Sequence, residues 1–125
     1  MADEHIITNL VKSYTSGTPG RSLNNARMHH LVVDGPPYAG GPGEELTPAE
    51  VFLSGVSACA VLLVERAAQQ SGVPFQRAEV AIEGLRDTRD IDEVPAHFEN
   101  VKMRFELWGP VQRQAEELVA TYQHR

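Results

Sequence analysis

Cys59 is the only cysteine of this 125-residue chain and the side chain best suited to nucleophilic or redox chemistry. It lies about three turns into a predicted helix, in a stretch of small and apolar residues. A lone thiol cannot form a disulfide within its own chain. Free cysteine is often an apolar core filler, and the position alone favours that inert role. A reactive thiol would need a nearby cation and access for a small substrate.

Glu50 is a carboxylate on the same predicted helix, nine residues before Cys59. At about 100° and about 1.5 Å per residue, the two side chains lie on opposite faces, roughly 13 Å apart. Within one chain Glu50 therefore cannot touch the thiol. Its simplest role is in the helix cap. A catalytic role would require it to reach the thiol of another subunit, or to orient an arginine that does.

The cation that would ionise the thiol must come from another part of the sequence. The helix dipole acts mainly over the first turn, which Cys59 lies beyond. Arg21 and Arg27 are the candidates, although an isolated surface arginine is usually only solvated. His29 and His30 are adjacent in a predicted strand and would point to opposite faces. No His-x-x-x-His, Cys-x-x-Cys or carboxylate cluster occurs, so we expect no metal and no other cofactor.

The helix that carries Cys59 has strong start and stop signals. Thr47 is a suitable N-cap, Pro48 suits the first helical position, and Glu50 completes a capping box. Gly72 and Pro74 end the helix. Its early turns are apolar on every side, and their small residues would let another backbone approach closely. One small sheet could not cover such a helix, so we expect a second subunit to supply the remaining cover.

Two strands are predicted before this helix. Apolar residues indicate a first strand over residues 6–14 and a second over residues 26–33. They are expected to pair as an antiparallel hairpin. Residues 35–46 are rich in glycine and proline and predict a loop that leads to the helix.

Two further strands and a second helix follow. Alternating apolar and charged residues predict strands over 78–83 and 101–107. Helical spacing predicts an amphipathic helix over 110–123. The order β-β-α-β-β-α is an α+β fold, and the length is that of a single domain over residues 1–125.

Composition limits the partners and the compartment. The formal net charge of −6 argues against nucleic acid. The longest apolar run, residues 58–64, is far too short to span a bilayer, so we expect no membrane partner. The first residues are acidic and polar, unlike a signal peptide. One cysteine without a secretion signal is typical of a reducing cytoplasm, and we expect a cytoplasmic protein.

The most specific segment reads GPGEELTPAE over residues 41–50, followed by FLSGVSAC over residues 52–59. It resembles the OsmC-like superfamily, which includes osmotically inducible protein C and the organic hydroperoxide resistance proteins. The likeness covers roughly residues 8–123. It implies an intertwined homodimer in which two central buried helices are enclosed by sheets from both chains.

This resemblance implies that Cys59 is a peroxidatic thiol that attacks small organic hydroperoxides and becomes a sulfenic acid. The alkyl group would lie against Phe52 and Val56. Family peroxidases carry a second, resolving cysteine just after the C-terminal helix, at a place that would fall about where this sequence reaches Arg125. With Cys59 as the only thiol, the resemblance implies reduction by an external thiol.

The resemblance also implies that an arginine activates Cys59, and that a carboxylate near Glu50 steers that arginine across the dimer interface. Arg21 follows Gly20 in the expected turn, and Arg27 could serve instead. The alternative to a peroxidase is a non-enzymatic member of the family, either a redox sensor or a binder of a small apolar ligand. A third reading keeps Cys59 as an inert core residue.

Overall fold

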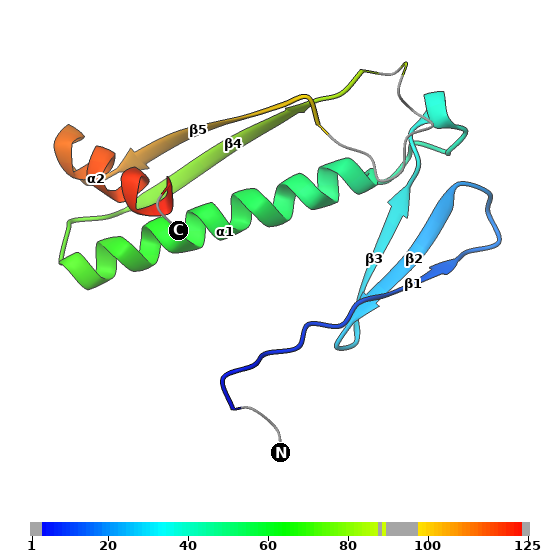
Figure 1. Ribbon diagram of the computed structural model, residues 1–125, viewed down its shortest axis with the longest axis horizontal. Coiled ribbons are helices and arrows are strands. Elements are labelled where there is room, and N and C mark those ends of the chain that lie inside the picture. The colour runs from blue at the N-terminus through cyan, green and yellow to red at the C-terminus, as the bar shows by residue number, and fades with distance from the viewer. Residues whose placement is uncertain (1–3, 88, 90–97, 124–125) are drawn as a thin grey trace. The chain divides into compact units, whose positions relative to one another are not determined.

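The computed structural model describes residues 4–87, 89 and 98–123, in two compact units of residues 1–51 and 52–125. Their elements confirm an α+β fold. In chain order they are β1 (Lys12–Thr15), β2 (Arg21–Ala26), β3 (His29–Asp34), the short 3₁₀ helix η1 (Pro37–Ala39), α1 (Pro48–Ser71), β4 (Arg77–Leu85), β5 (Asn100–Trp108) and α2 (Gln112–Gln123) (Figure 1).

The first unit contains a three-stranded antiparallel sheet in the order β1-β2-β3. The prediction of one strand over residues 26–33 was wrong, because β2 and β3 are separate strands joined by a tight turn at Arg27 and Met28. Both turn residues have positive φ, 50° and 76°. Two such residues are what a two-residue turn with the twist of its flanking strands requires. Such turns usually carry Asn-Gly, so Arg-Met gave no turn signal.

The first strand is also shorter than predicted, since β1 covers Lys12–Thr15 rather than residues 6–14. Its ladder with β2 starts at the pair Lys12 and Asn25. The chain of β2 turns away just after Ala26, so β2 offers residues 6–11 no backbone to pair with. Ile7, 83% exposed, and its apolar neighbours in this segment lie in the open.

The start of α1 is the predicted capping box. The Thr47 N–H donates to Glu50 Oε1 at 2.9 Å, and the Glu50 N–H donates to Thr47 Oγ1 at 3.2 Å. The predicted end is confirmed as well. Gly72 has a φ of 68°, and the N–H of Val73 donates to the carbonyl of Ala68 at 3.1 Å. This closure satisfies a helix carbonyl that would otherwise lack a partner.

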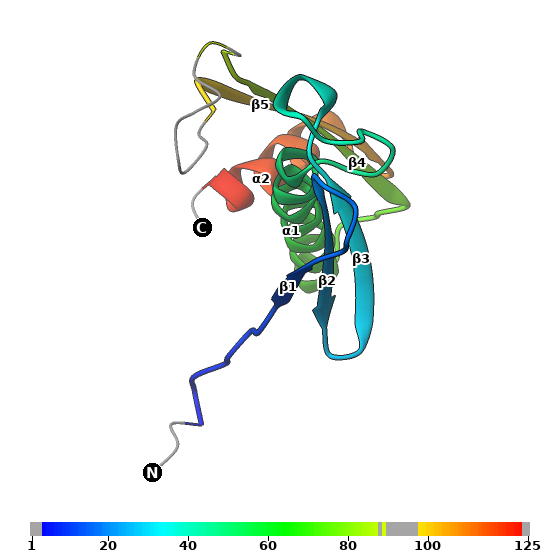
Figure 2. The same cartoon turned by 90° about the vertical axis from the view of Figure 1, so that its right-hand side faces the viewer.

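The second unit packs the later turns of α1 against α2 and the antiparallel pair β4 and β5, as Figures 1 and 2 show. Both predicted strands are confirmed, and α2 begins two residues later than expected. One face of the strand pair is half-buried and the other carries charged side chains. The core consists of Val64, Ala68 and Leu118, with Ala67, Val73, Phe75, Phe105 and Leu107 packed against them.

Candidate functional site

Cys59 is exposed on α1, so the described part of the chain does not bury it as a core residue. The helical repeat places Phe52, Val56 and Leu62 on the same side of α1 as the thiol. We call these four residues the thiol face. Phe52 is 62% exposed and Leu62 is 60% exposed, while Val56 is half-buried. The thiol therefore lies in an apolar setting that the described residues leave open.

The buried side of α1 is turned away from the thiol face and carries Ala60, Val64 and Ala68. By length and composition the helix as a whole could cross a membrane, and 17% of its most apolar 18-residue stretch is buried. The length of the uninterrupted apolar run, residues 58–64, underestimates the apolar length of this helix. The whole helix has 24 residues and extends about 36 Å. The core helix of a soluble protein passes the same test.

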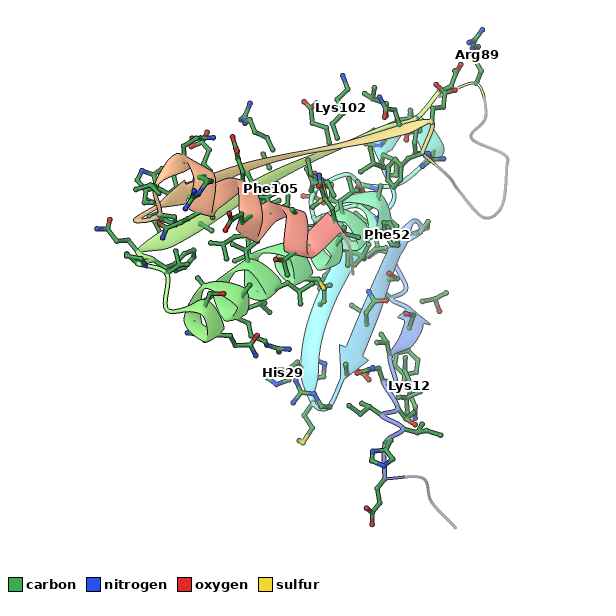
Figure 3. The ribbon with its side chains drawn as sticks, turned by 60° about the vertical axis from the view of Figure 1, so that its left-hand side comes forward. Lys12, His29, Phe52, Arg89, Lys102 and Phe105 are labelled. Carbon is green, nitrogen blue, oxygen red and sulfur yellow. The ribbon has the colours of Figure 1, made fainter. Side chains whose placement is uncertain are left out.

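Phe98 is a neighbour of the thiol face that sequence analysis did not identify. Its ring stacks on that of Phe52, with centroids 6.3 Å apart and an angle of 26° between the planes. The ring also lies over Gly84 of β4, where an added Cβ would collide with it. Phe52, labelled in Figure 3, therefore has an aromatic neighbour from the segment just before β5.

Glu50 uses its carboxylate in the cap of α1, where Oε1 accepts the Thr47 N–H. Its side chain is exposed and lies on the opposite face of α1 from Cys59, as the spacing predicted. The structure thus gives Glu50 a structural role. Its second carboxylate oxygen makes no hydrogen bond within residues 4–87, 89 and 98–123.

Arg21 belongs to a charged network in the first unit. Its Nε donates to Asp34 Oδ1 at 2.7 Å, and its Nη2 donates to Asp34 Oδ2 at 2.9 Å. Nη2 also reaches Glu44 Oε1 at 3.2 Å. The Asp34 side chain is fully buried, and that of Arg21 is 25% exposed. Sequence analysis identified neither Asp34 nor Glu44 as a partner of Arg21.

The Asp34 carboxylate also accepts the backbone N–H groups of Glu44 and Glu45, each at 3.0 Å. The hydrogen bonds from Arg21 are the main reason that the pKa of Asp34 falls to about 2, against the opposing effect of burial. The two backbone N–H groups lower it further. In return, Asp34 raises the pKa of Arg21. Both groups are therefore charged at neutral pH.

Arg27 lies at the opposite end of β2 from Arg21, in the exposed turn before β3. The six steps along the strand from residue 21 to residue 27 span roughly 20 Å. His29, labelled in Figure 3, is beside this turn. Within the described residues, no three His, Cys, Asp or Glu side chains gather closely enough to hold a metal ion. Arg21 is held by hydrogen bonds to Asp34 and Glu44. Among the hydrogen bonds and ion pairs of the described chain, none involves the Arg27 side chain.

The hairpin register would have revealed the partner of Arg21. A two-residue turn at positions 27 and 28 pairs Arg21 with Asp34, as the ladder shows. The strand predicted over residues 26–33 stops just before Asp34, so no partner was predicted for this carboxylate. The turn at positions 27 and 28 was not recognisable from its residue types. Without it, the register between β2 and β3 could not be predicted.

The structure places this chain among α+β proteins that carry an exposed cysteine on a long apolar helix. Comparison of its sequence with protein-family models identifies the family. The family model for OsmC-like protein matches residues 41–125, and the chain belongs to this family. The predicted family and fold class are thus confirmed. No curated protein sequence matches the chain.

Solved structures share the fold at low identity. An OsmC-like protein from Mycoplasma pneumoniae has a TM-score of 0.76 at 14% identity, covering 95% of this chain and 82% of that one. An organic hydroperoxide resistance protein OsmC from Legionella pneumophila has a TM-score of 0.72 at 19% identity, covering 97% and 85%. The organic hydroperoxide resistance protein OhrB of Bacillus subtilis has a TM-score of 0.63 at 17% identity, covering 94% and 84%.

Proposed function

We propose that this protein is a homodimeric, thiol-dependent peroxidase that reduces small organic hydroperoxides in defence against oxidative stress. One observation carries the proposal: a member of the OsmC-like family exposes its only thiol, Cys59, on an open apolar face of its long helix. An exposed cysteine beside apolar side chains is accessible to a small molecule that has a polar reactive end and an apolar tail. Organic hydroperoxides have that chemistry.

The proposed reaction uses Cys59 as its thiolate. The sulfur attacks the terminal peroxide oxygen, so that an S–O bond forms while the O–O bond breaks. The alkoxide leaves and takes up a proton to become an alcohol, and the sulfur is oxidised to a sulfenic acid. An external thiol condenses with the sulfenic acid and releases water. A second thiol then frees Cys59 and leaves as a disulfide. The reducing cytoplasm would supply these thiols.

A second copy of this chain is the proposed cover for the thiol face. Phe52 and Leu62 are both more than half exposed, and a contiguous exposed apolar patch on a protein surface marks an interaction site. Gly55 and Ala58 are exposed on the same side of α1, and a Cβ on Gly55 would meet open space. Small residues there would let a partner helix approach closely, and the site would then be completed by both chains.

Arg21 is the proposed activating arginine, in preference to Arg27. Its hydrogen bonds in the described chain use Nε and Nη2, which leaves Nη1 to face a thiolate. Arg27 is an exposed turn residue without such a scaffold. In this proposal Arg21 acts on Cys59 across the dimer interface, and Glu50 steers it with the carboxylate oxygen that the helix cap leaves open.

The test is to mix reduced protein with cumene hydroperoxide, trap a sulfenic acid on Cys59 with dimedone, and follow peroxide loss with dithiothreitol present. We expect the adduct and many turnovers. The C59S variant should show neither, and a wild-type protein without an adduct would overturn the proposal. An adduct that forms without turnover would favour a redox sensor instead. Phe52 and Val56 would be supported as the alkyl site if F52A raises the KM for cumene hydroperoxide more than that for hydrogen peroxide.

A further inference from the structure

We propose that Asp34 is a positioning residue, which orients Arg21 and ties it to the loop that leads into the N-terminus of α1. This inference rests on the proposed role of Arg21 toward Cys59. It concerns only the first unit, where every contact that carries it is found.

The first step is the geometry of the pair. Arg21 and Asp34 are directly opposite each other in the β2–β3 ladder. Two parallel hydrogen bonds join the planar guanidinium to the planar carboxylate, at 2.7 and 2.9 Å. Such a bidentate pair fixes the plane and direction of the guanidinium, which one hydrogen bond would not do. The direction of Nη1 therefore depends on Asp34.

The second step is the chemistry of the other partners. Asp34 also accepts the N–H groups of Glu44 and Glu45, so all four of its partners are donors. An ionised carboxylate only accepts hydrogen bonds and suits such a site. An amide of the same shape would turn an N–H toward at least one donor. A fully buried side chain has no water to resolve that conflict.

The third step is the connection to the helix. The Asp34 N–H donates to the carbonyl of Leu46 at 2.9 Å, directly before the N-cap Thr47. At the other end of the loop, the Gly35 N–H donates to the carbonyl of Gly20 at 2.8 Å. A Cβ on Gly41 would collide with the carbonyl of Gly35, so the loop is closely packed onto the strand end. Residue 34 thus links the arginine to the start of α1.

The experiment compares Asp34→Asn with Glu44→Gln in the full-length protein. The E44Q variant weakens only the exposed contact at 3.2 Å and is the matched control. The rate at which Cys59 reacts is measured with iodoacetamide across pH and with cumene hydroperoxide. We expect D34N to lower both rates at pH 7 by on the order of tenfold to a hundredfold, since misorientation of a catalytic group costs that much. It should also move the pH midpoint of iodoacetamide reactivity upward. E44Q should stay within about twofold of wild type, in line with a partly exposed ion pair.

A double-mutant cycle separates positioning from a purely structural role. In an Arg21→Ala background, D34N should cause no further loss, because the residue through which it acts is gone. An equal loss in both backgrounds would overturn the inference, as would an R21A variant with wild-type reactivity. If D34N does not fold, R21K decides the question. It keeps the charge and leaves Asp34 intact but lacks the planar fork, so wild-type reactivity of R21K would overturn the inference.

The iodoacetamide measurement needs no peroxide, which keeps the two proposals distinguishable. If the variants change iodoacetamide reactivity as expected but no hydroperoxide is reduced, the proposed peroxidase fails and the positioning role of Asp34 stands. If hydroperoxide is reduced equally by wild type and D34N, the positioning role alone fails.

Discussion

Arg21 and Asp34 are joined by two parallel hydrogen bonds across β2 and β3, and the carboxylate of this pair is fully buried. The pair lies at the end of the hairpin from which the glycine-rich loop departs toward α1. A buried carboxylate is costly unless its charge is compensated. Here one guanidinium and two backbone N–H groups compensate it, so every group that stabilises the buried charge belongs to the first unit.

Acid should weaken the first unit within a defined pH window. The pKa of Asp34 is about 2 in the folded protein, against 3.8 for the ordinary side chain. A lowered folded-state pKa contributes stability above the ordinary value, and this contribution is lost as the pH falls from about 3.8 to about 2. We expect the urea midpoint, measured by circular dichroism, to fall in this window. D34N should show a flatter dependence there. An unchanged slope would contradict the assignment.

Charge on the thiol face should separate the proposed dimer. We expect Leu62→Glu to give a monomer in multi-angle light scattering, because a glutamate would not tolerate burial against a second chain. Ala81→Glu, an exposed position of β4 opposite Arg104, adds the same charge away from the thiol face and should remain dimeric. A wild-type protein that is a folded monomer at micromolar concentration would contradict the intertwined dimer.

The two members of the capping box should have separable effects. Thr47→Ala removes the acceptor for the Glu50 N–H and should lower the free energy of unfolding by about 1 kcal/mol. Glu50→Gln keeps an acceptor for the Thr47 N–H and should change stability little. If the Glu50 carboxylate also steers Arg21, E50Q should lower the rate of Cys59 oxidation while the melting temperature stays close to that of wild type. If E50Q lowers the stability but not the rate of Cys59 oxidation, the role of Glu50 is limited to the helix cap.

The β2–β3 turn offers a stabilising substitution. Met28 has a φ of 76° and is 91% exposed, so Met28→Gly should remove left-handed strain worth roughly 1 kcal/mol without removing packing. Ala26→Gly, just before the turn, should instead lower stability by roughly 0.5–1 kcal/mol. Thermal unfolding measures both. A destabilised M28G would contradict the turn geometry.

The same turn tests the choice between the two arginines. Arg27→Ala should leave the rate of Cys59 oxidation within about twofold of wild type, because a solvated turn residue contributes little to a site elsewhere. Arg21→Ala should lower that rate strongly. The opposite pattern in single-turnover peroxide assays would transfer the activating role to Arg27.

Local signals explain why much of the chain could be predicted. The capping box of Thr47 and Glu50 and the stop at Gly72 depend on residues within one or two helical turns. Strict alternation in β4 and β5 reports a sheet with one buried face, which depends on each strand alone. The first unit was predicted less well, because its short strands lack clear alternation and its tight turn has no glycine or asparagine.

The sequence by itself therefore determined the capped helix, the place of Cys59 three turns into it, and the opposition of Glu50 to the thiol, since helical geometry follows from spacing. Only the tertiary structure decided the register of β2 and β3 and, with it, the pairing of Arg21 with Asp34. That pairing joins residues thirteen positions apart through a turn whose conformation neither residue determines. The tertiary structure also showed which side of α1 remains exposed, because burial depends on the strands and helix that pack against the other side.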